Sequence, residues 1–138
     1  MQLNSWGHIA HDMWTETAVH FHAVSIDTFV VMPNHTHAII TISSPDAVGA
    51  GFPRPSGPPP AESATPNSAG PSLGQIIGFY KWMTTKRINE IRGTPGRSLW
   101  QRNYFEHVIR GQRSYEAIGE YIVTNPARWR EDSLNSDA

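Results

Sequence analysis

The stretch VSIDTFVVMPNHTHAIITI, residues 24–42, sets the centre of the fold because it carries two strand patterns around a short turn. Residues 24–31 and 35–42 both alternate along the chain with the period of two that is typical of strands. Between them, Pro33 fixes φ and Asn34 tolerates turn geometry. We therefore predict that the two strands pair as a hairpin.

Two histidines, His35 and His37, lie one residue apart in the second strand. Side chains alternate across a strand, so both point from one face and converge, while Thr36 points from the other. Imidazole is a common metal ligand, so this H-x-H pair is suited to supply two ligands. Two ligands do not complete a site, and the plain alternative is a pair of partly exposed sheet histidines.

Length and composition predict one soluble domain. A chain of 138 residues is long enough for one hydrophobic core. It contains no cysteine, so disulfides and thiolate metal sites are excluded, and a metal would need imidazole, carboxylate, amide or water ligands. We expect no secretory leader, and no apolar run approaches the roughly 18 residues of a membrane span. We expect a single cytoplasmic domain, residues 1–138.

Charge is distributed unevenly along the chain, although the formal net charge is only −1. Residues 81–113 contain eight Lys and Arg against two Glu, whereas the rest of the chain contains three Lys and Arg against ten acidic residues. Such a basic block is a candidate surface for the phosphates of nucleic acid. A solvated helix face has the same composition, so the block alone is only suggestive.

The patterns around the hairpin predict three helices and one more strand. We expect helices at 7–21, 73–91 and 114–125, a strand at 104–110, and a flexible Pro/Gly/Ser-rich tether at 43–72. The closing helix is expected to stop at Pro126, which cannot continue a helix. This order of elements predicts an α+β sandwich with a mostly antiparallel sheet.

The closing helix contains EYIVTNP, in which Tyr121 and Asn125 are four residues apart and share a helical face. Tyr121 lies at the edge of the buried stripe, where its phenol either packs or presents its oxygen to a cleft. Packing is the usual role of a lone helical tyrosine. Asn125, before Pro126, is by default a helix-ending residue.

The sequence LWQR, residues 99–102, precedes the last predicted strand. Trp100 could stack on a base, Gln101 could form hydrogen bonds with base edges, and Arg102 could contact a phosphate. All three interactions are used in binding single-stranded nucleic acid. In the alternative interpretation, Trp100 fills the edge of the core and the polar pair is solvated.

Taken in order, these motifs resemble the single-tyrosine HUH transposases of bacterial insertion sequences. The resemblance rests on H-x-H after MPN, then FYK, WQR, YFEHVIR and YIVTNP, and it covers residues 3–42 and 73–130. Within that class the sequence is most similar to the domesticated transposases associated with repetitive extragenic palindromes. The resemblance implies a ferredoxin-like or RRM-like sandwich with its helices on one face of the sheet.

The resemblance also implies roles for individual residues. His35, His37 and Asn125 match positions that bind a divalent metal, Mg²⁺ or Mn²⁺, and Tyr121 matches the nucleophile. The family cuts and rejoins single-stranded DNA beside imperfect hairpins, typically as a homodimer. The side chains expected to contact that DNA are Lys81, Lys86, Arg87, Trp100, Gln101, Arg102, Arg110 and Arg113.

The sequence departs from the family pattern in two places. Thr36 stands between the histidines, where the family usually has a hydrophobic residue. Family members usually begin with a strand inside the sheet, and this sequence begins after that point, so the first strand is expected to be missing. Three functions therefore stay open: an active DNA-nicking and joining enzyme, an N-terminally truncated relic that binds hairpin DNA, and an unrelated metal-dependent hydrolase that uses water.

Overall fold

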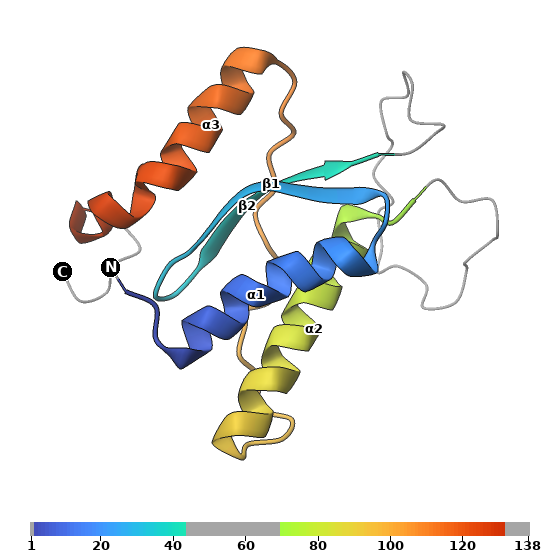
Figure 1. Ribbon diagram of the computed structural model, residues 1–138, viewed down its shortest axis with the longest axis vertical. Coiled ribbons are helices and arrows are strands. Elements are labelled where there is room, and N and C mark those ends of the chain that lie inside the picture. Colours follow the sequence, from blue (N-terminus) through green and yellow to red (C-terminus); the bar gives the residue numbers. More distant parts are fainter. Residues whose placement is uncertain (1, 44–69, 132–138) are drawn as a thin grey trace.

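The computed structural model describes residues 2–43 and 70–131. In chain order, the elements are α1 (Ser5–His20), β1 (Val24–Val31), β2 (Thr36–Ile42), α2 (Leu73–Arg92), α3 (Gln112–Thr124) and the 3₁₀ helix η1 (Asn125–Glu131) (Figure 1). This arrangement confirms the predicted α+β class. Most of the predicted tether at 43–72 lies outside the described residues. None of the described helices is long and apolar enough to cross a membrane.

Strands β1 and β2 pair as the predicted antiparallel hairpin. Val31 lies opposite Thr36, and the Met32 backbone N–H closes the turn by donating to the His35 carbonyl at 2.8 Å. The turn places His35 directly before β2, so the paired histidines open the second strand.

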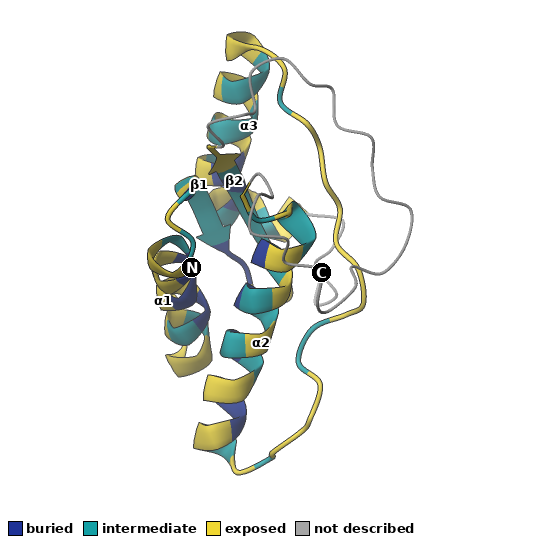
Figure 2. Ribbon diagram, turned by 90° about the vertical axis from the view of Figure 1, so that its right-hand side faces the viewer, coloured by how far each residue is buried: buried dark blue, intermediate teal, exposed yellow. Residues whose placement is uncertain are grey.

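One face of the hairpin is covered by α1 and α2, and the hydrophobic core lies there. The rings of Trp14 and Tyr80 stack with 3.8 Å between their centroids. Trp14 Nε1 donates to Thr36 Oγ1 at 3.1 Å, and Tyr80 Oη donates to the Ala10 carbonyl at 2.9 Å. Thr36 therefore points toward α1, as the strand alternation predicts. Figure 2 shows that the outer sides of α1 and α2 are exposed.

Local signals place the ends of these helices. Asn4 caps α1 by accepting a hydrogen bond from a backbone N–H of its first turn at 2.8 Å. Ser72 and Gln75 form a capping box at the start of α2, and Gly93 ends that helix in the left-handed conformation, with φ at 65°. The predicted helix at 73–91 is thus confirmed almost unchanged.

Helix α3 covers the opposite face of the hairpin (Figure 1). A Cβ at Gly119 would lie 3.9 Å from Ile39 Cδ1, so the helix backbone approaches β2 closely. Tyr115 Oη donates to Asp27 Oδ2 at 3.3 Å, which ties the start of α3 to β1. The helices thus cover both faces rather than the single face predicted. The physical reason is that Ile39, on this second face, is 5% exposed and needs cover just as Ile40 does on the first face.

The closing helix was predicted to stop at Pro126, but at this point it only changes from an α-helix to a 3₁₀ helix. Asn125 ends α3, and the chain continues as the 3₁₀ helix η1 through Glu131. Proline is tolerated in the first turn of a helix, where its missing N–H has no obligatory partner. The residues of η1 therefore stay against α3, and Trp129 comes close to His35.

The strand predicted at 104–110 is not formed, and this segment is neither helix nor strand. Phe105 is fully exposed and Val108 is 63% exposed. Each set of alternating positions mixes apolar side chains with Glu106, Arg110 or His107, so neither face can be buried cleanly. A strand also needs a neighbour for its backbone groups, and in the described residues β1 and β2 pair only with each other.

Candidate active site

His35 and His37 lie side by side where β2 begins. Their ring centroids are 4.8 Å apart in a T-shaped arrangement, with the ring planes at 79°. Both side chains are partly buried, and the Nε2 atom of each is enclosed by protein. His35 Nδ1 lies 2.7 Å from Asn34 Oδ1, so a proton on Nδ1 would be donated to that oxygen and leave Nε2 as an acceptor. Binding of a metal through Nε2 requires this tautomer.

Tyr121 approaches the histidine pair from α3. Its ring centroid lies 5.6 Å from that of His37, with the ring planes at 75°. Tyr121 is 48% exposed, whereas the adjacent Ile122 is 3% exposed and anchors the helix. The structure thus brings together three residues that the sequence singled out, His35, His37 and Tyr121, and leaves the tyrosine accessible from solvent.

Asn125 follows one turn after Tyr121, at the boundary between α3 and η1. It is 2% exposed, and its Nδ2 is a buried donor without a hydrogen-bond partner among the described residues. An unsatisfied buried polar group costs about 1–3 kcal/mol, so such an atom indicates a missing partner. A half-turn of the amide would present Oδ1 at the same position, and this oxygen is a suitable ligand for a divalent cation.

Trp129, in η1, belongs to this cluster but was not identified from the sequence. Its ring centroid lies 5.9 Å from that of His35. Trp129 lies four residues after Asn125, but past Pro126 in a 3₁₀ helix with three residues per turn, so α-helical spacing gave no signal for it. Four rings form a row of neighbours, which we call the ring row, in the order Tyr121, His37, His35, Trp129.

The ligands available to a metal at this place are few. Among residues 2–43 and 70–131, no three His, Cys, Asp or Glu side chains are grouped so that they could hold a metal ion. A cation at the histidine pair would therefore need a neutral oxygen as its third protein ligand. Asn125 is the buried amide between Tyr121 and Trp129, which both contact the pair.

Two of the predicted DNA contacts take part in the fold. Lys81 Nζ donates to the carbonyls of Gln101 and Asn103, at 3.0 and 2.6 Å, and partial burial lowers the pKa of Lys81. The Trp100 ring packs against Tyr80, 5.6 Å between centroids, at the edge of the core. Lys81 thus anchors the segment after α2, and the position of Trp100 favours its alternative role in the core.

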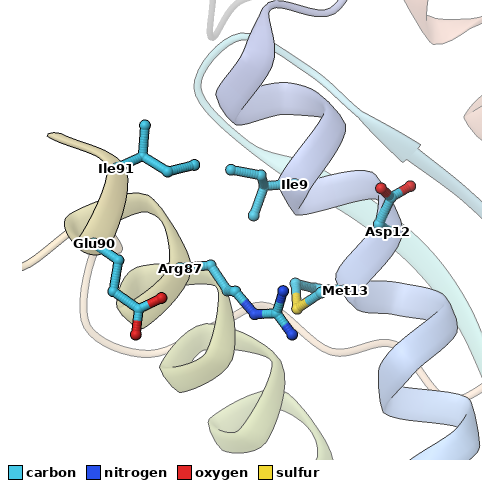
Figure 3. Close-up of a pocket in the computed structure, with 6 residues that line it drawn as sticks. All are labelled: Ile9, Asp12, Met13, Arg87, Glu90 and Ile91. Atoms are coloured by element: carbon cyan, nitrogen blue, oxygen red, sulfur yellow. The ribbon is translucent and has the colours of Figure 1, made fainter.

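The other predicted DNA contacts lie on separate surfaces. Lys86 Nζ lies over the exposed ring of Trp82, 5.3 Å from its centroid. Arg87 points into a pocket of about 260 Å³ between α1 and α2, which Asp12 and Glu90 also line (Figure 3). Because α2 lies across the hairpin from α3, the sheet separates these residues from the histidine pair. The last four predicted DNA contacts are all exposed: Gln101, Arg102, Arg110 and Arg113.

Fold and site together define a class of protein: a small α+β domain in which a strand with paired histidines is covered by a helix that presents a tyrosine. No family model and no solved structure matches the chain. An uncharacterized protein of Haemophilus influenzae is 35% identical to it over 140 residues, which span 99% of this chain and 73% of that protein. The chain therefore belongs to the same family as this Haemophilus influenzae protein.

Proposed function

We propose that the protein cuts and rejoins single-stranded DNA beside hairpins, by transesterification at Tyr121. The observation that carries this proposal is the approach of the Tyr121 ring to His37, at 5.6 Å, within a histidine pair. An accessible phenol beside two imidazoles and a buried amide suits attack on a phosphodiester better than it suits core packing. The order of the sequence motifs, which resembles that of HUH transposases, supports the same reaction.

The proposed reaction keeps the nucleophile attached to the DNA. Tyr121 Oη would attack the scissile phosphorus and form a P–O bond to it, while the bond from phosphorus to the 3′ oxygen breaks. The phenol proton would end on the departing oxygen, which gives a 3′-hydroxyl and a 5′-phosphotyrosine. A different 3′-hydroxyl could then attack this linkage, regenerate the tyrosine and join two strands without ATP.

His35, His37 and Asn125 would hold the divalent cation, Mg²⁺ or Mn²⁺, that the resemblance implies. Two imidazoles and an amide oxygen suit such a cation, and the buried Asn125 amide with its unpartnered Nδ2 supports this assignment. When bound, the cation would neutralise phosphate charge and polarise the scissile bond. The histidine pair would also fix the phosphate within reach of Tyr121.

The proposed partner is a single strand that folds into imperfect hairpins. Arg110 and Arg113 are exposed and lie at the start of α3, the helix that carries the tyrosine, so they are placed to contact the DNA backbone. Binding through such residues would weaken steeply as salt increases. A homodimer, as the resemblance implies, is part of the same proposal.

The test is to incubate the full chain with Mg²⁺ or Mn²⁺ and 3′-labelled hairpin DNA from the flanks of its gene, followed by denaturing electrophoresis. We expect a covalent protein–DNA band that is absent in Tyr121→Phe and in His35→Ala. Tyr115→Phe is the matched control, because Tyr115 lies on the same helix and bonds Asp27 instead. This control should keep the band.

Three results would contradict the proposal. A covalent band that survives Tyr121→Phe would place the nucleophile elsewhere. Cleavage without any covalent band, unchanged by Tyr121→Phe, would favour a metal-dependent hydrolase that uses water. Salt-sensitive hairpin binding with neither cleavage nor adduct would favour a DNA-binding relic.

A further inference from the structure

Trp129 lies at the end of the ring row opposite to Tyr121. Its indole is partly exposed and contacts His35, whereas Tyr121 contacts His37. We propose that Trp129 stacks on the nucleobase immediately 5′ of the scissile phosphate, so that η1 forms a base subsite beside the leaving group. This inference rests on the proposed function of Tyr121 and adds which nucleotide of the substrate is recognised.

The side on which this base lies follows from the geometry of displacement at phosphorus. Attacking and leaving oxygens are roughly in line on opposite sides of the phosphorus atom. A phosphate held at the histidine pair has Tyr121 at one end, so the departing 3′ oxygen and its nucleoside extend toward the other end. That end is occupied by Trp129, 5.9 Å from His35 between ring centroids.

The surface around Trp129 has the space and charge for a nucleotide. A hollow of about 470 Å³ is lined there by Pro126, Ala127, Trp129 and Arg130. Trp129 supplies a flat apolar ring and the exposed Arg130 a cation, the combination that binds bases and phosphates of single strands.

The other tryptophans near basic residues do not offer this arrangement. Trp100 packs on Tyr80 at the edge of the core. Trp82 is 58% exposed and lies beside Lys86, but it belongs to α2 and is separated from the histidine pair by the sheet. Trp82 is therefore a matched control, a more exposed tryptophan next to a cation and away from the ring row.

The experiment measures binding of uncleaved single-stranded DNA by the Tyr121→Phe protein, with and without Trp129→Ala. The DNA carries one abasic site, moved stepwise along the strand, and the wild-type adduct maps the scissile phosphate. On intact DNA, Trp129→Ala should weaken binding about 5- to 150-fold, the range of one base stacked on an aromatic ring. Trp129→Phe should retain most of the affinity.

The decisive result is whether the losses of binding caused by Trp129→Ala and by an abasic site depend on each other. When the base 5′ of the scissile phosphate is absent, Trp129→Ala should cause no further loss, whereas Trp82→Ala should act independently of every abasic position. Additive losses at all positions would mean that Trp129 only supports His35, and coupling to the base 3′ of the cleavage point would reverse the assigned direction. Either result overturns the subsite.

The outcome also separates this inference from the proposed function. An adduct at Tyr121 without coupling between Trp129 and the 5′ base would contradict the base subsite and support the proposed cleavage activity. Coupling of Trp129 to one base without any adduct would contradict the proposed cleavage activity and support a base-binding site on η1. Absence of both would overturn both.

Discussion

The two faces of strand β2 differ in how their polar groups are satisfied. On the face toward α1, Thr36 accepts a hydrogen bond from Trp14 Nε1, and Tyr80 donates to the Ala10 carbonyl. Trp14 and Tyr80 are 2% and 1% exposed, so these buried polar atoms are paired inside a dry core. The polar groups of Trp14 and Tyr80 thus have partners, whereas Trp100 Nε1, at the edge of the same core, is buried without a hydrogen-bond partner among the described residues.

The face toward α3 also carries polar side chains, but these do not form the same kind of buried hydrogen bonds. Tyr121 is 48% exposed beside His37, and Asn125 is buried with an Nδ2 that lacks a partner in the described residues. A partner for such a buried atom, whether a water or a ligand, would be stabilising. One strand therefore packs against the hydrophobic core on one face and against the candidate reactive site on the other, because successive side chains point to opposite faces.

Removing the central ring of the core should have the largest effect on stability. Trp14→Ala deletes a nearly fully buried indole that stacks on Tyr80, so we expect a loss of about 3–5 kcal/mol in the free energy of unfolding. Trp82→Ala, at a 58% exposed position, should cost less than about 1 kcal/mol. Urea denaturation followed by circular dichroism measures both. Similar losses for the two variants would contradict the assigned core.

The attachment of α3 to the second face should have the next largest effect. Ile122 is 3% exposed next to Tyr121, so Ile122→Ala should cost about 2–4 kcal/mol. Val123, on the same helix, is 69% exposed, and Val123→Ala should change stability by less than about 0.5 kcal/mol. If both variants unfold like the wild type, α3 is not held on the sheet and the ring row would not persist.

Much of this comparison was visible in the sequence, because strand alternation is local. Thr36 and His37 are adjacent, and their opposite directions follow from the period of two alone. The ends of α2 were predictable for the same reason, since Ser72 and Gly93 are local capping signals. The meeting of His37 and Tyr121 was predicted from the resemblance, and the structure brings the two rings together.

What the sequence did not reveal depends on distant contacts. Residues 104–110 have strand-like composition, but strand formation requires a neighbour that periodicity cannot supply. Trp129 reaches His35 only because the chain continues past Pro126 as η1. The side of the sheet taken by α3 is likewise decided by the packing of whole elements against each other.

Tyr80 and Tyr121 should respond differently to loss of their hydroxyl groups. The effect on stability should be smaller than those of Trp14→Ala and Ile122→Ala. Tyr80 Oη has a buried acceptor at Ala10, so Tyr80→Phe should cost about 1–2 kcal/mol at neutral pH. Tyr121→Phe should cost less than about 0.5 kcal/mol, because the residue is 48% exposed. Equal costs would contradict the contrast between the two faces.

The pH dependence of unfolding sharpens this last contrast. Burial raises the pKa of Tyr80 in the folded state far above its usual value of about 10, whereas the unfolded chain ionises at the usual value. The contribution of Tyr80 is therefore fully present below pH 10 or so and declines above it, as the unfolded state loses a proton that the folded state keeps. Urea titrations between neutral and alkaline pH should show this decline in the wild type and in Tyr121→Phe, and a smaller decline in Tyr80→Phe. An identical alkaline decline in all three proteins would mean that the Tyr80 hydroxyl is not enclosed by the core.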